Sequence, residues 1–148
     1  MKMFELASGS SIWKGMNYHH ENRVISWRDW DKNCFQGEVK GSGDQVYHVM
    51  IDPAHPRKST CDCPFADGRR VICKHMIALY LGIFPEKEEQ FMNYVEHQNE
   101  VYQLELERER IEQQQKIRKY VMSLSKAELR EKLIDLMIAD MDDRHRFY

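Results

Sequence analysis

The sequence is poor in glycine, proline and cysteine, and it contains no long apolar run. Among 148 residues there are seven glycines, four prolines and four cysteines, which excludes collagen-like, low-complexity and disulfide-dense chains. No stretch approaches the eighteen or so consecutive apolar residues of a membrane-spanning helix, so we expect no membrane partner. The beginning, MKMFEL, lacks the pattern of a secretory leader, so we expect a reducing, cytoplasmic location.

Neither glycine nor proline occurs between residues 86 and 148, which favours uninterrupted helix. The mixture of Glu, Gln, Lys and Arg with scattered apolar residues predicts a long helix from about Lys87 to Met122. Ser125 followed by Glu128 is a capping box, so a second helix is predicted to begin at Lys126. This helix carries a wide apolar stripe formed by Leu129, Leu133, Ile134, Leu136, Met137, Ile138 and Met141.

The first part of the chain contains three apolar runs separated by turn residues. The runs lie near residues 22–29, 35–41 and 45–52, and they predict an antiparallel meander with one buried face. Before the meander, Ser10 or Ser11 is expected to cap a short helix that carries Trp13, Met16 and Tyr18.

Charge is nearly balanced overall, at a net −2, but it is unevenly distributed. Residues 1–82 hold eleven basic and nine acidic side chains, whereas residues 83–148 hold eleven basic and fifteen acidic ones. This distribution excludes a generally basic nucleic-acid binder, so any attraction to phosphate must be local.

Two closely spaced pairs of metal-binding residue types follow the meander. Cys61 and Cys63 are two residues apart, so their side chains share one face of an extended strand or tight turn. Cys73 and His75 are expected just before and within the first turn of a helix that begins at about Lys74. Three thiolates and one imidazole complete the tetrahedral shell of structural Zn²⁺ and leave no open position for a catalytic water. The sequence therefore predicts a closed, structural zinc site.

Between the pairs, Asp67-Gly68 is a turn signal that brings the two halves of the site together. The whole pattern, CDCPF, a nine-residue spacer and CKHMIALYLG, resembles the SWIM-type zinc finger. The resemblance covers roughly residues 4 to 84, because the preceding strand meander also agrees with that family. It implies a zinc-dependent domain that interacts with DNA or with proteins, since SWIM domains occur in chromatin-remodelling ATPases, transposase-related proteins and recombination accessory proteins.

Other uses of the cysteines fit less well. An iron–sulfur cluster is usually held by four Cys, or by two Cys and two His, and neither count occurs here. Oxidation of the zinc thiolates in a redox switch stays open as an alternative. Cys34 shares a predicted strand face with polar residues, so we expect it to lie outside the metal site.

Basic residues gather near the predicted metal site, namely Arg57, Lys58, Arg69, Arg70 and Lys74. They form a candidate nucleic-acid contact surface, and the alternative is a solvated rim of a folded domain. For Trp27 and Trp30 we expect packing in the core in preference to stacking on bases.

These observations predict an α+β fold, in which a three-stranded antiparallel meander with a zinc knuckle and short helices precedes a C-terminal helical hairpin. The expected domains are residues 4–84, which bind zinc, and residues 86–148, which are helical. The expected function is a non-enzymatic zinc adaptor that binds nucleic acid, a protein partner or both. The alternative is a protein-binding scaffold whose C-terminal helices associate with a partner or with another copy of the chain.

Overall fold

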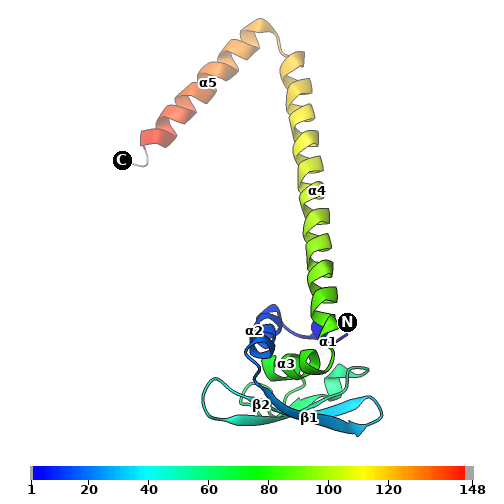
Figure 1. Cartoon of the computed structure of the whole chain (residues 1–148). Helices are drawn as coiled ribbons and strands as arrows, with labels where there is room; N and C mark the ends of the chain where they lie inside the picture. Colours follow the sequence, from blue (N-terminus) through cyan, green and yellow to red (C-terminus); the bar gives the residue numbers. More distant parts are fainter. Residues whose placement is uncertain (1, 146–148) are drawn as a thin grey trace. The chain divides into compact units, whose positions relative to one another are not determined.

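The computed structural model describes residues 2–145, and it describes side chains as far as residue 141 (Figure 1). The last three residues of the predicted helical region thus lie outside the described part. The chain separates into two compact units, Met1–His97 and Gln98–Tyr148. The boundary falls inside a long helix, α4 (Glu86–Ser123).

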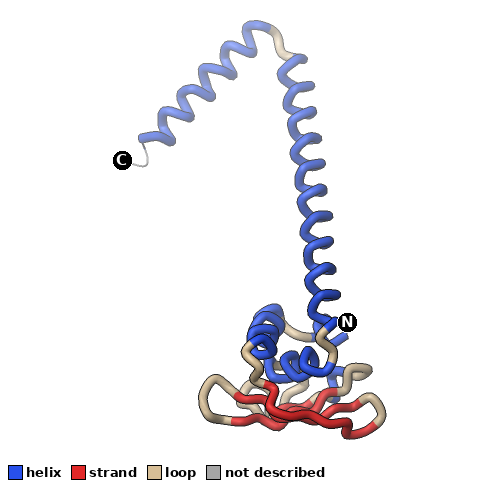
Figure 2. The backbone as a smooth tube through the Cα atoms, viewed as in Figure 1, coloured by secondary structure: helices blue, strands red, loops and turns tan. Residues whose placement is uncertain are grey.

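The first unit contains a four-stranded antiparallel sheet (Figure 2). Its strands, in spatial as well as sequence order, are β1 (Val24–Asp31), β2 (Cys34–Lys40), β3 (Val46–Ile51) and β4 (Thr60–Cys61). The predicted meander is confirmed, but the count of three strands was one too low. Strand β4 was missed because it has only two residues, and it exists through its pairing of Cys61 with Val49 and of Thr60 with Met50 in β3.

The two faces of the sheet differ in composition. Val39, Val49 and Ile51 point to the inner face and are almost completely buried. The outer face carries two cross-strand rows, which are Ser26–Glu38–His48 and Arg28–Gln36–Met50–Thr60. The inner face therefore forms one wall of the core, as the alternating pattern predicted, and the outer face is polar.

Helices cover the inner face of the sheet in two layers (Figure 1). The helices of the first unit are α1 (Lys2–Leu6), α2 (Gly9–His20), the single 3₁₀ turn η1 (Pro56–Lys58) and α3 (Lys74–Ile83). Helix α3 packs against the sheet and is buried over most of its circumference, while α2 packs against α3. The predicted cap of α2 was wrong by two or three residues, because the hydroxyl of Ser8 accepts from the amide of Ser11.

Two glycines allow these layers to approach closely. A Cβ atom at Gly15 in α2 would lie 2.5 Å from Cβ of Ile77 in α3. A Cβ atom at Gly37 in β2 would lie 2.6 Å from Cδ1 of Leu79. A side chain at either position would overlap its neighbour, so close packing requires glycine at both positions.

The C-terminal part of the chain is helical, as predicted. Helix α4 spans Glu86–Ser123 and α5 spans Lys126–His145. The capping box of α5 is confirmed, since Glu128 accepts from the amide of Ser125 at 2.8 Å and Ser125 accepts from the amide of Glu128 at 3.3 Å. The apolar stripe of α5 is exposed along its length, so the packing expected of a helical hairpin stays a prediction. Among residues 2–145, no helix combines the length and hydrophobicity needed to cross a membrane.

We expect Gly15→Ala to destabilise the first unit by about 1–3 kcal/mol, because the added methyl group overpacks the contact between α2 and α3. Gly9→Ala in the same helix is the matched control, since nothing lies within 4 Å of a Cβ atom there. Denaturant unfolding followed by tryptophan fluorescence would measure both variants. Equal midpoints for the two variants would contradict the close approach at Gly15.

Candidate metal centre

The four predicted zinc ligands come from two segments that the fold brings together. Cys61 ends β4 and is held by its pairing with Val49 in β3. Cys63 follows two residues later, and its carbonyl accepts hydrogen bonds from the amides of Ala66 and Asp67. Cys73 is the N-cap of α3 and His75 lies in the first turn of that helix. The predicted helix start at Lys74 is confirmed.

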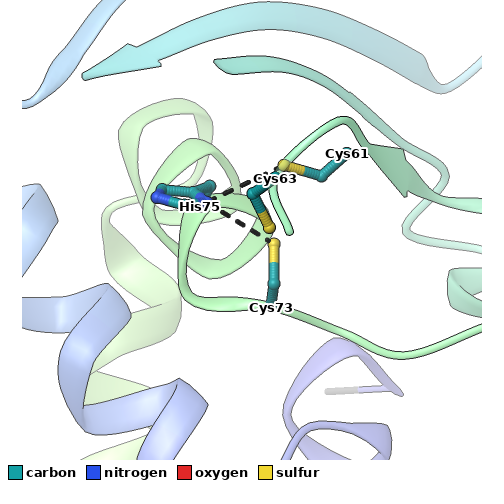
Figure 3. A group of neighbouring side chains, drawn as sticks. All are labelled: Cys61, Cys63, Cys73 and His75. Carbon is teal, nitrogen blue, oxygen red and sulfur yellow. Dashed lines mark hydrogen bonds between the residues drawn. The ribbon is translucent and has the colours of Figure 1, made fainter. Parts of the chain in front are cut away.

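The ligand atoms converge on one point (Figure 3). One donor atom from each of Cys61, Cys63, Cys73 and His75 lies within 4.8 Å of all the others, and all four side chains are buried. Nδ1 of His75 is 3.8 Å from Sγ of Cys61 and 3.9 Å from Sγ of Cys73. These separations are close to the roughly 3.8 Å between donors in a tetrahedral zinc–thiolate site. The residues present therefore fit Zn²⁺, with His75 binding through Nδ1.

A turn between the two halves sets their separation. The amide of Arg69 donates to the carbonyl of Ala66, and Gly68 adopts a positive φ of 66°. Glycine takes this conformation without the steric penalty of a Cβ atom. The turn predicted at Asp67-Gly68 is confirmed.

Ionisation differs among the three thiols. Hydrogen bonds from Cys61 and then from His75 lower the pKa of Cys73 to about 4. The hydrogen bond with Cys73, followed by burial, raises the pKa of Cys61. Burial, followed by the charge of Cys73, raises the pKa of Cys63. A dication at the centre offsets the repulsion between thiolates, which allows all three sulfurs to act as ligands.

Aromatic packing orients the histidine ligand. The ring of Tyr47 lies 4.5 Å from the ring of His75, and the ring of Tyr18 lies 5.5 Å from it. Nε2 of His75 is buried without a hydrogen-bond partner among the described residues. Histidine ligands usually donate this second N–H to an acceptor, so here ring packing fixes the imidazole. One sequence pattern points to this role, because alternation along β3 places Tyr47 on the inner face together with Val49.

Three of the five basic residues singled out by sequence line one hollow beside the metal centre. Arg57, Arg69 and Arg70 line a hollow of about 540 Å³ together with Cys61. We call it the arginine hollow. Lys74 lies elsewhere, where its ammonium donates to the hydroxyl of Tyr18 at 2.6 Å. Lys58 belongs to η1 and does not line the arginine hollow.

The expectation that the tryptophans pack in the core was wrong. Trp27 is 47% exposed and Trp30 is 59% exposed. Both lie on β1, which is an edge strand of the sheet. The amino-acid type predicted burial, but β1 has a neighbouring strand on one side only, and the contact of Trp27 with Phe35 covers just part of its ring. Cys34 lies in β2, outside the cluster of ligands, as expected.

We expect Cys73→Ser to abolish zinc binding and to unfold the first unit while the helical signal of α4 and α5 persists. Structural zinc contributes on the order of 10 kcal/mol in zinc-finger peptides, which matches the total stability of a small domain. Elemental analysis, near-UV circular dichroism and limited proteolysis would measure the change. Cys34→Ser is the control and should keep stoichiometric zinc. A Cys73→Ser protein with full zinc and an unchanged near-UV spectrum would contradict the assignment.

Comparison with known families agrees with this geometry. Residues 47–81 match the family model described as SWIM zinc finger, and the match contains all four ligands. The matched segment is shorter than the resemblance expected from sequence, since the helices α1 and α2 and the strands β1 and β2 precede it. No curated protein and no solved structure matches the chain. The order of the ligands, their convergence and the family match together identify residues 47–81 as a SWIM-type zinc finger.

Proposed function

We propose that the protein is a zinc-dependent adaptor of the cytoplasm that binds nucleic acid through the arginine hollow. The observation that carries this proposal is the convergence of Arg57, Arg69 and Arg70 beside the zinc site. None of these three guanidinium groups takes part in an ion pair with a described carboxylate. Their charges are thus available to phosphate oxygens, which guanidinium groups bind in a bidentate manner.

The ligand count supports binding in preference to catalysis. Catalytic zinc sites keep three protein ligands and one exchangeable position, whereas this site offers four buried protein donors. The zinc then acts as a cross-link that holds β4, the turn at Gly68 and the start of α3 in place. Arg69 and Arg70 follow that turn directly, so the metal also fixes the backbone that presents them.

We expect Arg69→Glu combined with Arg70→Glu to abolish binding of fluorescent oligonucleotides at low salt. The wild-type affinity should fall as salt rises, with a slope of about −0.7 to −0.9 per phosphate contact. Fluorescence anisotropy at several salt concentrations would measure both effects. The control is Lys126→Glu combined with Arg130→Glu, which makes the same charge change on α5 and should bind as the wild type does. Flat titrations of the wild-type protein at low salt would refute nucleic-acid binding.

A second candidate function is self-association through the helical region. Large apolar side chains on α4 and α5 are exposed, among them Leu104 at 67%, Met122 at 80% and Leu136 at 67%. Apolar surface of this extent on consecutive helices is typical of surfaces that bind another protein.

The charge pattern of α4 favours a second copy of the chain as that protein. Residues 86–107 carry seven acidic and one basic side chain, whereas residues 108–123 carry five basic and two acidic ones. Two such helices in antiparallel orientation would place each acidic half against a basic half. The same order of charges also suits the macrodipole of a single helix, so the oligomeric state has to be measured.

We expect the wild-type protein to sediment as a dimer and Lys116→Glu combined with Arg118→Glu to sediment as a monomer. Mixing that variant with Glu96→Lys combined with Glu105→Lys should restore a dimer, because the reversed charges again face opposite charges. Analytical ultracentrifugation at low and moderate salt would measure both. A wild-type protein that remains monomeric at every concentration would refute this candidate.

A further inference from the structure

We propose that the outer face of the sheet is a binding track for single-stranded nucleic acid, on which bases stack on tryptophan at β1 and phosphates reach the arginine hollow beside β4. This inference rests on the proposed function and deepens it. It names the form of nucleic acid and the residues that contact the bases.

The outer face provides a continuous row of side chains from one edge of the sheet to the other. Arg28 in β1 pairs with Gln36 in β2, which pairs with Met50 in β3, which pairs with Thr60 in β4. At a spacing of about 4.8 Å between strands, the row spans about 14 Å. Within the described residues of the first unit, the helices lie on the opposite face (Figure 1), so the row is accessible.

Two hollows on this face meet at one residue. The first, of about 380 Å³, is lined by Ser26, Trp27, Arg28, Gln36, Glu38 and His48. The second is the arginine hollow, which His48 also lines. The exposed side chain of Arg28 on β1 is thereby connected to the three guanidinium groups across the width of the sheet.

The β1 end of the track has the chemistry of a stacking platform. The guanidinium of Arg28 lies 5.6 Å from the ring centre of Trp30, and both side chains are exposed. Trp27 belongs to the inner face, because it pairs with Gly37 and its ring centre lies 6.2 Å from that of Phe35. Trp30 is therefore the indole ring that this end of the track offers. Aromatic rings stack on bases regardless of sequence, and arginine adds a cation–π contribution.

The middle of the track suits bases better than phosphates. The amide of Gln36 and the hydroxyl of Ser26 offer neutral hydrogen-bonding groups. The carboxylates of Glu38 and Asp62 lie 3.7 Å and 3.0 Å from His48, and they disfavour a phosphate at this point. The free phosphate-binding groups lie beyond them, in the arginine hollow.

A single strand fits this arrangement and a duplex does not. In a duplex the faces of the bases are covered by their neighbours, so a tryptophan on a flat sheet has no base face to contact. A protein partner at this edge is the competing occupant. The polar lining of the first hollow favours nucleic acid, because protein-binding patches are most apolar at their centre.

The test compares three exposed tryptophans in the zinc-loaded protein, of which only Trp30 lies on the track. Trp30→Ala should weaken binding of a single-stranded DNA or RNA oligonucleotide at least about fivefold, as loss of one stacking contact does. Trp27→Ala, on the inner face of the same strand, should bind as the wild type does. Trp13→Ala is the matched control, since Trp13 is 49% exposed on α2, away from the track. Trp30→Phe should retain most of the affinity because it keeps an aromatic face. Zinc content and near-UV spectra would verify that each variant is folded.

The salt dependence of the affinity distinguishes the contribution of tryptophan at β1 from that of the arginine hollow. Trp30→Ala should lower the affinity without changing the slope against salt, whereas Arg69→Glu combined with Arg70→Glu should reduce that slope. Equal affinity of Trp27→Ala, Trp30→Ala and Trp13→Ala, or a preference for duplex, would overturn the track while nucleic-acid binding by the arginines would stand. No binding of any oligonucleotide would refute the proposed function, and the track with it.

Discussion

The clasp formed by Cys61, Cys63, Cys73 and His75 is the constraint on which the first unit depends. It ties a two-residue strand, too short to pair stably by itself, to the first turn of α3. Helix α3 in turn occupies the space between the sheet and α2. Because burial in so small a domain yields little net stability, a cross-link between two of its layers has a large effect on whether the domain folds.

The same clasp accounts for the arrangement of the surface around it. The turn at Gly68 and the two arginines after it lie between the two ligand pairs, so their backbone is held at both ends. On the other side, Tyr47 on the inner face of β3 packs on His75 and connects the metal centre to the sheet. Rigid presentation reduces the entropy lost on binding, which suits a recognition surface. The start of α4 packs on the first unit through Phe91, whose ring lies 4.5 Å from that of Phe4.

Sequence patterns predicted the structure correctly where the interactions join residues that are close in the sequence. The ligand spacing predicted the metal and its four donors, and the capping box at Ser125 predicted the start of α5 at the correct residue. Features that depend on contacts between residues far apart in the sequence were predicted wrongly. Strand β4 forms only because β3 lies beside it, and Trp27 and Trp30 are about half exposed because β1 is an edge strand with a neighbour on one side only.

The sequence by itself determined the donor set, the α+β class and the helical nature of residues 86–123, because spacing, alternation and the lack of glycine and proline act over a few residues. The tertiary structure decided which side chains share a surface. It gathered Arg57 with Arg69 and Arg70, separated Lys74 from them, and joined two hollows at His48. Such neighbours are set by strand order and helix packing, which no short window of sequence encodes.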